Sequence, residues 1–157
     1  MNIGEICSRE VYVFGPEETL ADAAAEMERR HVGAVVVIEH EGDCVRPIGI
    51  VTDRDVVRGQ ISRRADLFSI AIKDVMTARP LTVNESCGVT EAIGQMSARG
   101  VRRAPVVNSS GDLVGIVTFD DLLPVVVEEI GALARLLATQ ARRERAIVPA
   151  PKTGSTP

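Results

Sequence analysis

The stretch Gly49-Ile50-Val51-Thr52, with Asp55 three residues after its threonine, decides the fold of this 157-residue chain because it occurs twice. It returns as Gly115-Ile116-Val117-Thr118, again followed three residues later by an aspartate, Asp121. Upstream, the chain aligns with itself at an offset of 69 residues, so that Leu20 falls on Val89. This self-similarity indicates two copies of one supersecondary unit, each too small to bury its apolar face alone. We expect the copies to pack together as one folding unit.

Each copy begins with a short extended segment and an amphipathic helix. The extended segments are predicted over Val11–Phe14 and Leu81–Val83. The first helix starts at Thr19, where Asp22 three residues later completes a capping-box pattern, and Gly88 replaces the threonine in the second copy. Both copies therefore run from strand to helix.

Two strands and a second helix complete each copy. Unbroken apolar runs are typical of strands covered on both faces. Such runs lie at Ala34–Ile38, Ile48–Val51, Ala104–Val107 and Leu113–Val117. The polar segment Glu39–Arg46 is predicted as a loop, Asp53–Arg58 as a helix, and Gly59–Lys73 as the connection between the copies. The pattern predicts an α/β fold of two pseudo-symmetric βαββα-type repeats, with short sheets covered by helices.

The last helix is predicted to continue beyond the repeat. Apolar residues recur at helical spacing through Leu122–Ala141, and the C-terminus has the composition of a disordered tail. The predicted parts are a first repeat, a second repeat, a helical extension and a tail, at residues 1–62, 63–123, 124–146 and 147–157.

Composition disfavours several classes of protein. A net charge of −4 and a pI near 5.3 argue against a nucleic-acid surface, although Arg142, Arg143 and Arg145 form a basic cluster. No apolar run approaches the ~20 residues that cross a bilayer and no signal sequence follows Met1, so we expect a cytoplasmic protein that does not bind membranes. Three widely spaced cysteines and two histidines favour free thiols over a disulfide framework or metal site. No catalytic apparatus converges in the sequence, so we expect a non-enzyme.

The doubled motif permits one kind of binding chemistry. A threonine at a strand end and an aspartate in the next helical turn both lie at a helix N-terminus, where unpaired N–H groups attract phosphate. The aspartate can accept hydrogen bonds from the two hydroxyls of a ribose. The same residues also have a structural interpretation, because the threonine can cap the helix and the helix dipole alone favours the acid by about 0.3 to 1 kcal/mol. The spacing leaves both interpretations open.

The doubled motif, together with Pro16–Leu20, Asp74–Thr77 and Val101–Val106, resembles the cystathionine-β-synthase (CBS) domain family over about residues 3 to 123. The resemblance implies a tandem CBS pair with nucleotide clefts between the repeats. It assigns the sugar and phosphate to Thr52, Arg54, Asp55, Thr118 and Asp121, further phosphate contacts to Arg102 and Arg103, and the adenine to Val13, Ala34, Thr82 and Ala104. Because only the second copy carries two arginines before its strand, it is the expected phosphate site, although Asp120 opposes an anion there.

The resemblance implies a regulatory role. The ligand would be AMP, ADP, ATP or S-adenosylmethionine, with no obligatory cofactor, and binding would act through a conformational change. Such pairs associate as homodimers through their helical faces, and the module would regulate an enzyme or transporter in trans. The alternative is a ligand-free dimerisation scaffold, because the same fold can persist with both clefts empty.

Overall fold

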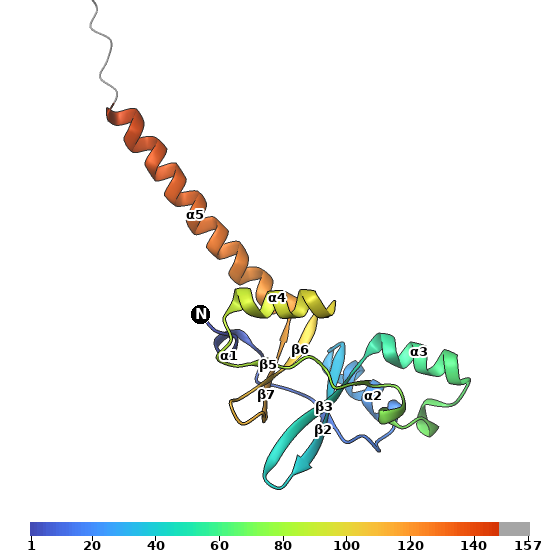
Figure 1. Ribbon diagram of the computed structural model, residues 1–157. Helices are drawn as coiled ribbons and strands as arrows, with labels where there is room; N and C mark the ends of the chain where they lie inside the picture. The colour runs from blue at the N-terminus through green and yellow to red at the C-terminus, as the bar shows by residue number, and fades with distance from the viewer. Residues whose placement is uncertain (148–157) are drawn as a thin grey trace, which may run out of the picture. The chain divides into compact units, whose positions relative to one another are not determined.

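Two βαββα repeats follow one another along the chain, as the sequence predicts (Figure 1). The structure is a computed structural model that describes residues 1–147, with side chains as far as Arg143, so the tail predicted over residues 147–157 lies outside the described residues apart from Ile147. The first repeat comprises β1 (Val13–Phe14), α2 (Leu20–Arg30), β2 (Ala34–Glu41), β3 (Cys44–Thr52) and α3 (Asp53–Arg63). The second comprises β5 (Val83–Asn84), α4 (Val89–Arg99), β6 (Arg103–Val107), β7 (Leu113–Thr118) and α5 (Phe119–Ile147). The remaining elements are α1 (Ile3–Ile6), β4 (Thr77–Ala78) and two short 3-10 helices, Leu67–Ser69 and Ile72–Asp74.

The strands form two small sheets, one centred on each repeat. The first sheet has the order β1-β2-β3-β4, with β1 parallel to β2 and the other pairs antiparallel. The second has the order β5-β6-β7, again with a parallel pair followed by an antiparallel one. Residues Met1–Leu122 form one compact unit and Leu123 onward forms another, so α5 begins in the first unit and continues in the second. No helix within residues 1–147 combines the length and apolar character needed to span a bilayer.

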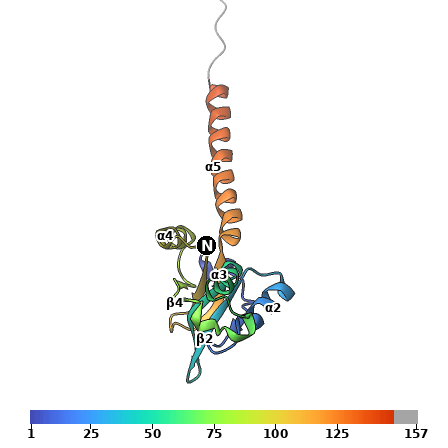
Figure 2. The same cartoon turned by 90° about the vertical axis from the view of Figure 1, so that its right-hand side faces the viewer.

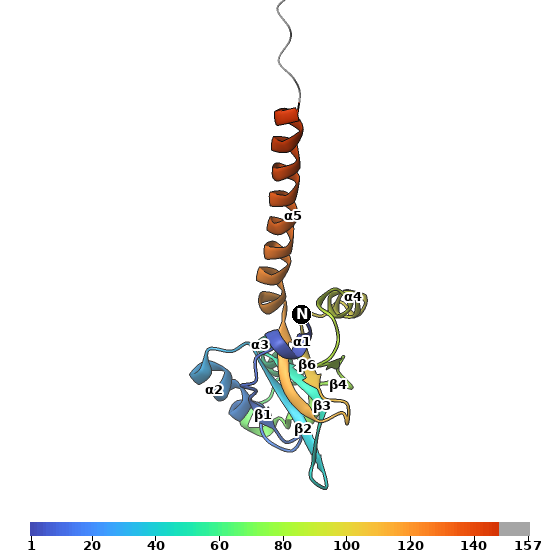
Figure 3. The same cartoon turned by 90° about the vertical axis from the view of Figure 1, so that its left-hand side faces the viewer.

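Helices cover the sheets with the apolar positions that repeat in the sequence. On α2, Leu20, Ala23 and Met27 are buried, and on α4 the equivalent Val89, Ala92 and Met96 are buried. Figures 2 and 3 show α2 and α4 on opposite flanks of the first unit. The core of the first repeat consists of Leu20, Ala23, Met27, Val35, Val37, Val51, Ile70 and Ile72. Aliphatic side chains therefore fill the interior, as the low aromatic content indicates.

The loop predicted over Glu39–Arg46 is wrong, because most of this segment is strand. Strands β2 and β3 stay paired as far as Glu41 and Cys44, and only Gly42 and Asp43 turn. Gly42 has a φ of +63°, a conformation that glycine adopts readily at the first position of a two-residue hairpin turn. The segment is polar because the hairpin projects into solvent, as the foot of Figure 3 shows, while its backbone stays paired.

Helix α3 is longer than the predicted Asp53–Arg58, and the connection between the copies is correspondingly shorter. The helix continues through Gly59 and ends at Arg63. Gly59 is buried, and a Cβ atom there would lie 2.9 Å from Val75 Cγ1 and 3.2 Å from Leu20 Cδ2. The glycine therefore allows close packing within the helix and does not end it.

The leading segment of each repeat pairs with the other repeat. The paired residues are Asn2 with Gly88 and Ser8 with Ile116 on one side, and Ala71 with Thr19 and Thr77 with Ile50 on the other. These pairs are related by the same offset as the sequence repeat. Thr77 and Ala78 of the second copy thus form strand β4 of the first sheet, and Ser8 of the first copy makes a single bridge to β7. This confirms that the pair packs as one unit.

The glycine of the doubled motif makes room for the exchanged segment. A Cβ atom at Gly115 would lie 2.8 Å from the Ser8 carbonyl oxygen and 2.8 Å from Cys7 Sγ. At Gly49, the same atom would lie 3.3 Å from Met76 Cβ and would overlap the rest of that side chain. Any larger residue at these positions would push the crossing segment off the sheet.

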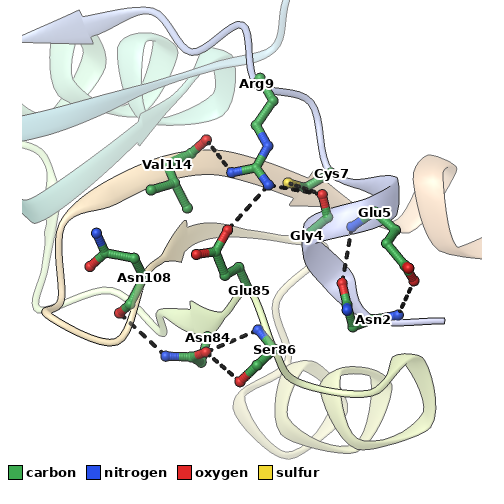
Figure 4. A network of polar contacts seen from close by, with 10 residues as sticks. All are labelled: Asn2, Gly4, Glu5, Cys7, Arg9, Asn84, Glu85, Ser86, Asn108 and Val114. Carbon is green, nitrogen blue, oxygen red and sulfur yellow. Dashed lines mark hydrogen bonds and ion pairs between the residues drawn. The ribbon is translucent and has the colours of Figure 1, made fainter.

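Arg9 fastens the N-terminal segment to the second repeat (Figure 4). Its guanidinium donates to the Val114 carbonyl oxygen at 3.2 Å, to the Gly4 carbonyl oxygen at 2.9 Å and to Glu85 Oε2 at 3.2 Å. Since Gly4 N–H also donates to the Glu85 carbonyl oxygen at 2.8 Å, the segment is held by side chain and backbone together.

We predict that Gly115→Ala destabilises the protein by about 1 to 3 kcal/mol, because the added methyl overlaps the backbone of the crossing segment. Urea denaturation measures the effect. Gly94→Ala is the matched control: Gly94 lies inside α4 with open space around it, so alanine should stabilise by roughly 0.5 to 1 kcal/mol. Equal effects of the two substitutions would refute the role assigned to Gly115.

Candidate functional site

A cavity of about 470 Å³ lies between the two copies within the first unit. We call it the inter-copy cavity. It is lined by Ser8, Glu10, Val11, Tyr12, Val32, Gly33, Ala34, Arg102, Arg103, Ile116, Thr118, Phe119, Asp120 and Asp121. Its volume falls in the range of small-molecule sites, and it combines apolar strand residues with a few charged groups. Both copies supply its walls because the leading segment of the first copy runs beside β7 of the second.

The threonine and aspartate of each motif form a capping box. At the start of α5, the Asp121 N–H donates to Thr118 Oγ1 at 3.3 Å, while the backbone N–H and hydroxyl of Thr118 both donate to Asp121 Oδ2 at 2.7 Å. At the start of α3, Thr52 and Asp55 repeat these bonds at 3.3, 2.9 and 2.9 Å. The other carboxylate oxygen of each aspartate, Oδ1, has no hydrogen-bond partner within the described part of the chain. Capping thus uses one of the two oxygens of each carboxylate.

The two helix N-termini differ in their remaining N–H groups. In α3, the Asp53 N–H donates to the Gly33 carbonyl oxygen at 3.3 Å and the Arg54 N–H to Asp53 Oδ1 at 2.8 Å. In α5, the Phe119 N–H donates to the Arg102 carbonyl oxygen at 2.8 Å, but the Asp120 N–H has no acceptor among residues 1–147. Only the α5 terminus therefore keeps a first-turn N–H for a ligand, and the expectation of unpaired N–H groups at both motifs is wrong for the first.

Two arginines face the cavity from the start of β6. The Arg103 guanidinium lies against Gly33, where a Cβ atom would come within 3.0 Å of Nη1. The Arg102 guanidinium lies over the Phe119 ring, 5.4 Å from its centroid. Against these cations stand the carboxylates of Glu10, Asp120 and Asp121, so the acidic side chains outnumber the basic ones.

Tyr12 supplies an aromatic face to the cavity. The Arg30 guanidinium lies over its ring, 4.9 Å from the centroid, and its hydroxyl donates to Glu10 Oε1. This hydrogen bond to a carboxylate raises the pKa of the Tyr12 phenol above its ordinary value, with smaller contributions from desolvation and the Glu10 charge, while the Arg30 charge opposes them. Phenol and acid thus form a polar pair at the cavity wall.

The structure gathers only some of the predicted ligand residues in this cavity. Those that line it are Ala34, Arg102, Arg103, Thr118 and Asp121. Those that do not are Val13, Thr52, Arg54, Asp55, Thr82 and Ala104. Ala104, on β6, is fully buried, and Val13, on β1, is 42% exposed but does not line the cavity. Asp55 lines a separate pocket between α3 and the segment Asp74–Thr77.

Several cavity residues escaped the sequence analysis, chiefly Tyr12, Glu10, Gly33 and Phe119. Tyr12 lies just before β1, and its neighbour Val11 also lines the cavity, so strand alternation did not mark it. For Glu10 and Phe119 no pattern marks the role. The three cysteines are free thiols, and no group of three metal-ligating side chains lies together among the described residues.

The Tyr12–Glu10 pair gives a pH-dependent signal that can be tested. Because Tyr12 is the single tyrosine of a chain without tryptophan, the ultraviolet absorbance of phenolate reports this residue alone. We predict that Glu10→Ala lowers the pKa of Tyr12, since it removes both the acceptor and the neighbouring negative charge. Glu39→Ala, on the exposed end of β2, should leave the titration unchanged. A Tyr12 titration insensitive to Glu10→Ala would contradict the pairing.

Comparison with known proteins agrees with this architecture. The family model for the CBS domain matches twice, over residues 3–62 and 72–128. An uncharacterized protein of Methanopyrus kandleri is 35% identical over 125 residues, which are 80% of this chain and 62% of that protein. The matched region thus spans about three fifths of this relative's length.

Two further comparisons extend the family. The inosine-5′-monophosphate dehydrogenase of Methanocaldococcus jannaschii is 30% identical over 119 residues, which are 76% of this chain but 22% of that enzyme. A CBS domain protein of Pyrobaculum aerophilum, solved in complex with AMP, superposes with a TM-score of 0.69 at 26% identity, over 77% of this chain and 89% of that one. Because the family model covers both repeats and the fold is that of solved CBS proteins, the chain belongs to the CBS domain family as a tandem CBS pair.

Proposed function

We propose that this CBS pair is a non-enzymatic regulatory module that binds an adenosine-type ligand in the inter-copy cavity and signals through a conformational change. One observation carries the proposal: Asp121 lies in the cavity wall with Oδ1 unengaged by described residues, beside the unpaired Asp120 N–H and two arginines. We include in the proposal a cytoplasmic homodimer that acts on an enzyme or transporter in trans.

The ribose would bind at Asp121. A carboxylate oxygen offers two lone pairs, so Oδ1 can accept hydrogen bonds from both vicinal hydroxyls while Oδ2 continues to hold Thr118. The capping box supports this role because it fixes the orientation of the carboxylate before the ligand arrives. Ligand binding then requires little reorganisation of the side chain.

The phosphate would bind at the start of α5. The Asp120 N–H lies at the positive end of the helix dipole, and Arg102 and Arg103 add cationic groups on the neighbouring strand. The base would lie against the apolar part of the lining, where Ala34, Val32 and Tyr12 are available for packing and stacking.

Signalling would follow from the two-sided construction of the cavity. A ligand that contacts Asp121 of the second copy and Ala34 of the first binds best when the copies hold one relative arrangement. It therefore shifts the equilibrium toward that arrangement by its difference in affinity. The complex of the P. aerophilum relative with AMP, and the match to part of a dehydrogenase, support a ligand-responsive module of this kind.

A ligand-free dimerisation scaffold remains the second candidate, and one observation favours it. Both capping boxes give Thr52, Asp55, Thr118 and Asp121 a structural task that needs no ligand. A scaffold would keep these residues for helix initiation alone.

We predict that at least one of adenosine, AMP, ADP, ATP and S-adenosylmethionine stabilises the protein. A ligand present at a hundredfold its dissociation constant adds about 2.7 kcal/mol to the free energy of unfolding, which thermal denaturation detects. Asp121→Ala should abolish this stabilisation. A flat response across the whole panel would favour the scaffold.

Asp55→Ala is the matched control for Asp121→Ala. Each substitution removes the acid of an equivalent capping box, so each should lower the stability of the ligand-free protein by roughly 1 kcal/mol. Only Asp121→Ala should also remove the response to ligand, because Asp55 lies outside the cavity. If Asp121→Ala keeps the full ligand shift, the ligand binds elsewhere.

We also predict that AMP binds more tightly than ATP, because three carboxylates oppose a long polyphosphate. Asp120→Asn should strengthen ATP binding on the order of fivefold at low salt and AMP binding less, with the difference shrinking as salt is added. Isothermal titration calorimetry measures both affinities. Asp43→Asn, in the β2–β3 turn, serves as the control. An ATP affinity that does not respond to Asp120→Asn would rule out this electrostatic account.

A further inference from the structure

The β2–β3 hairpin of the first copy contacts the β6–β7 turn of the second copy, residues 108–112 (Figure 3). The Val45 N–H donates to Asp112 Oδ1 at 3.3 Å, and the Arg46 guanidinium donates to the Ser110 carbonyl oxygen. We call these two hydrogen bonds, with the four residues that make them, the hairpin clasp. The clasp joins the copies at a place separate from the crossing of the leading segments.

The turn has the shape that this contact needs. Asn108 Oδ1 accepts hydrogen bonds from the Ser110 and Asp112 N–H groups, both at 2.9 Å. Gly111 has a φ of +85°, and a Cβ atom there would overlap Nη1 of Arg46 and lie 3.5 Å from its Cζ. Glycine is therefore needed here both for the backbone conformation and for the space that the guanidinium occupies.

Asp112 takes part in the clasp as a carboxylate. Desolvation raises the pKa of Asp112, but hydrogen bonds from three neighbours and the positive charge of Arg46 outweigh it and hold this pKa below its ordinary value. The three neighbours are Asn108 of the turn and Cys44 and Val45 of the hairpin. One carboxylate thus accepts hydrogen bonds from both copies.

The first copy carries an insertion where the clasp forms. The offset between the copies is 69 residues at Val37 and 66 residues at Gly49, so the first copy has three extra residues in between. After this change of offset, Arg46 and Asp112 occupy equivalent positions of the two copies and carry opposite charges. These charges attract one another across the boundary between the copies.

Two strands connect the clasp to the inter-copy cavity. Strand β7 starts directly after Asp112 and ends at Thr118 in the cavity wall, while β2 starts at Ala34 in that wall and leads into the hairpin. About six residues at ~3.4 Å each separate Asp112 from Thr118, so the clasp lies on the order of 20 Å from the wall. None of the four clasp residues, all of which the structure describes, lines the cavity. The clasp can therefore act on a ligand only through the arrangement of the copies.

We propose that the hairpin clasp holds the two copies in the arrangement that forms the inter-copy cavity, so that Arg46 and Asp112 are positioning residues for the ligand site. Ser8 pairs with Ile116 at the cavity end of β7, and the clasp holds the other end. A single attachment would let the copies pivot, whereas two attachments at opposite ends of one strand prevent it. A ligand then meets walls that are already aligned.

The role in ligand binding rests on the proposed function, but the arrangement of the copies can be measured without a ligand. The Ser8 and Ile116 N–H groups each donate to the carbonyl oxygen of the other residue, at 3.0 and 2.9 Å, across the copies. The Val36 N–H instead donates to the Tyr12 carbonyl oxygen within the first copy. Amide hydrogen exchange at these three groups therefore separates opening between the copies from unfolding of the whole unit.

Asp112→Ala should accelerate exchange at Ser8 and Ile116 about fivefold more than at Val36, because it removes a hydrogen bond between the copies. Asp112→Asn keeps an oxygen that can accept from the Val45 N–H, so its effect should be smaller. Equal acceleration at all three amides would overturn the proposal, since Asp112 would then support overall stability alone.

Asp43→Ala is the matched control. Asp43 lies in the turn of the same hairpin but takes no part in the clasp, so exchange at Ser8 and Ile116 should stay as in the unaltered chain. If Asp43→Ala opened these amides as much as Asp112→Ala does, the effect would belong to the hairpin in general and the proposal would fail.

Isothermal titration calorimetry with AMP connects the clasp to the ligand site. Arg46→Ala and Asp112→Ala should each weaken AMP binding about three- to tenfold, and Asp43→Ala should leave it unchanged. Full AMP affinity in an Asp112→Ala protein whose Ser8 and Ile116 amides exchange faster would overturn the positioning role. If the unaltered chain binds no AMP, the proposed function loses that ligand, and the exchange ratios alone decide whether the clasp holds the copies.

Discussion

The crossing of two leading segments over two glycines is the constraint on which the rest of the structure depends. Each segment pairs with a strand of the other copy, and it can lie there only because Gly49 and Gly115 present no side chain to it. The exchange ties together two repeats that are each too small to bury a core alone. It also brings the N-terminal segment beside β7, where it forms one wall of the inter-copy cavity.

The same motif that admits the crossing segment also starts the next helix. After the glycine come two apolar residues of the strand, then a threonine and an aspartate that cap α3 or α5. Strand, crossing point and helix start are thus encoded within seven residues. Because the capping box uses only one oxygen of the aspartate, a structural requirement leaves a carboxylate oxygen directed by the fold and available for binding.

The two copies differ at the start of their second helices and just before their central strands. At α3 every first-turn N–H is engaged by the protein itself, while at α5 the Asp120 N–H is not engaged by any described residue. The position before β2 is Gly33, and its counterpart before β6 is Arg102. Because Gly33 has no side chain, the Arg103 guanidinium of the other copy can lie against it. A symmetric fold thereby produces one asymmetric cavity.

The sequence by itself determined the repeat, the order of the elements, the buried apolar runs and the position of a threonine and an aspartate at the start of each second helix. These features are local, because periodicity and capping act within a few residues. It misjudged Glu39–Arg46 because polar residues mark solvent exposure as readily as they mark a loop.

Only the tertiary structure decided which candidates share a cavity. Ala34 and Asp121 line the same cavity because the two copies exchange segments. The residues of a segment do not by themselves show which strand of the other copy it will pair with. Tyr12 lines the cavity while Val13 does not, and Ala104 of β6 is fully buried outside it. Long-range packing sets these outcomes, since burial at one residue depends on side chains far away in the sequence.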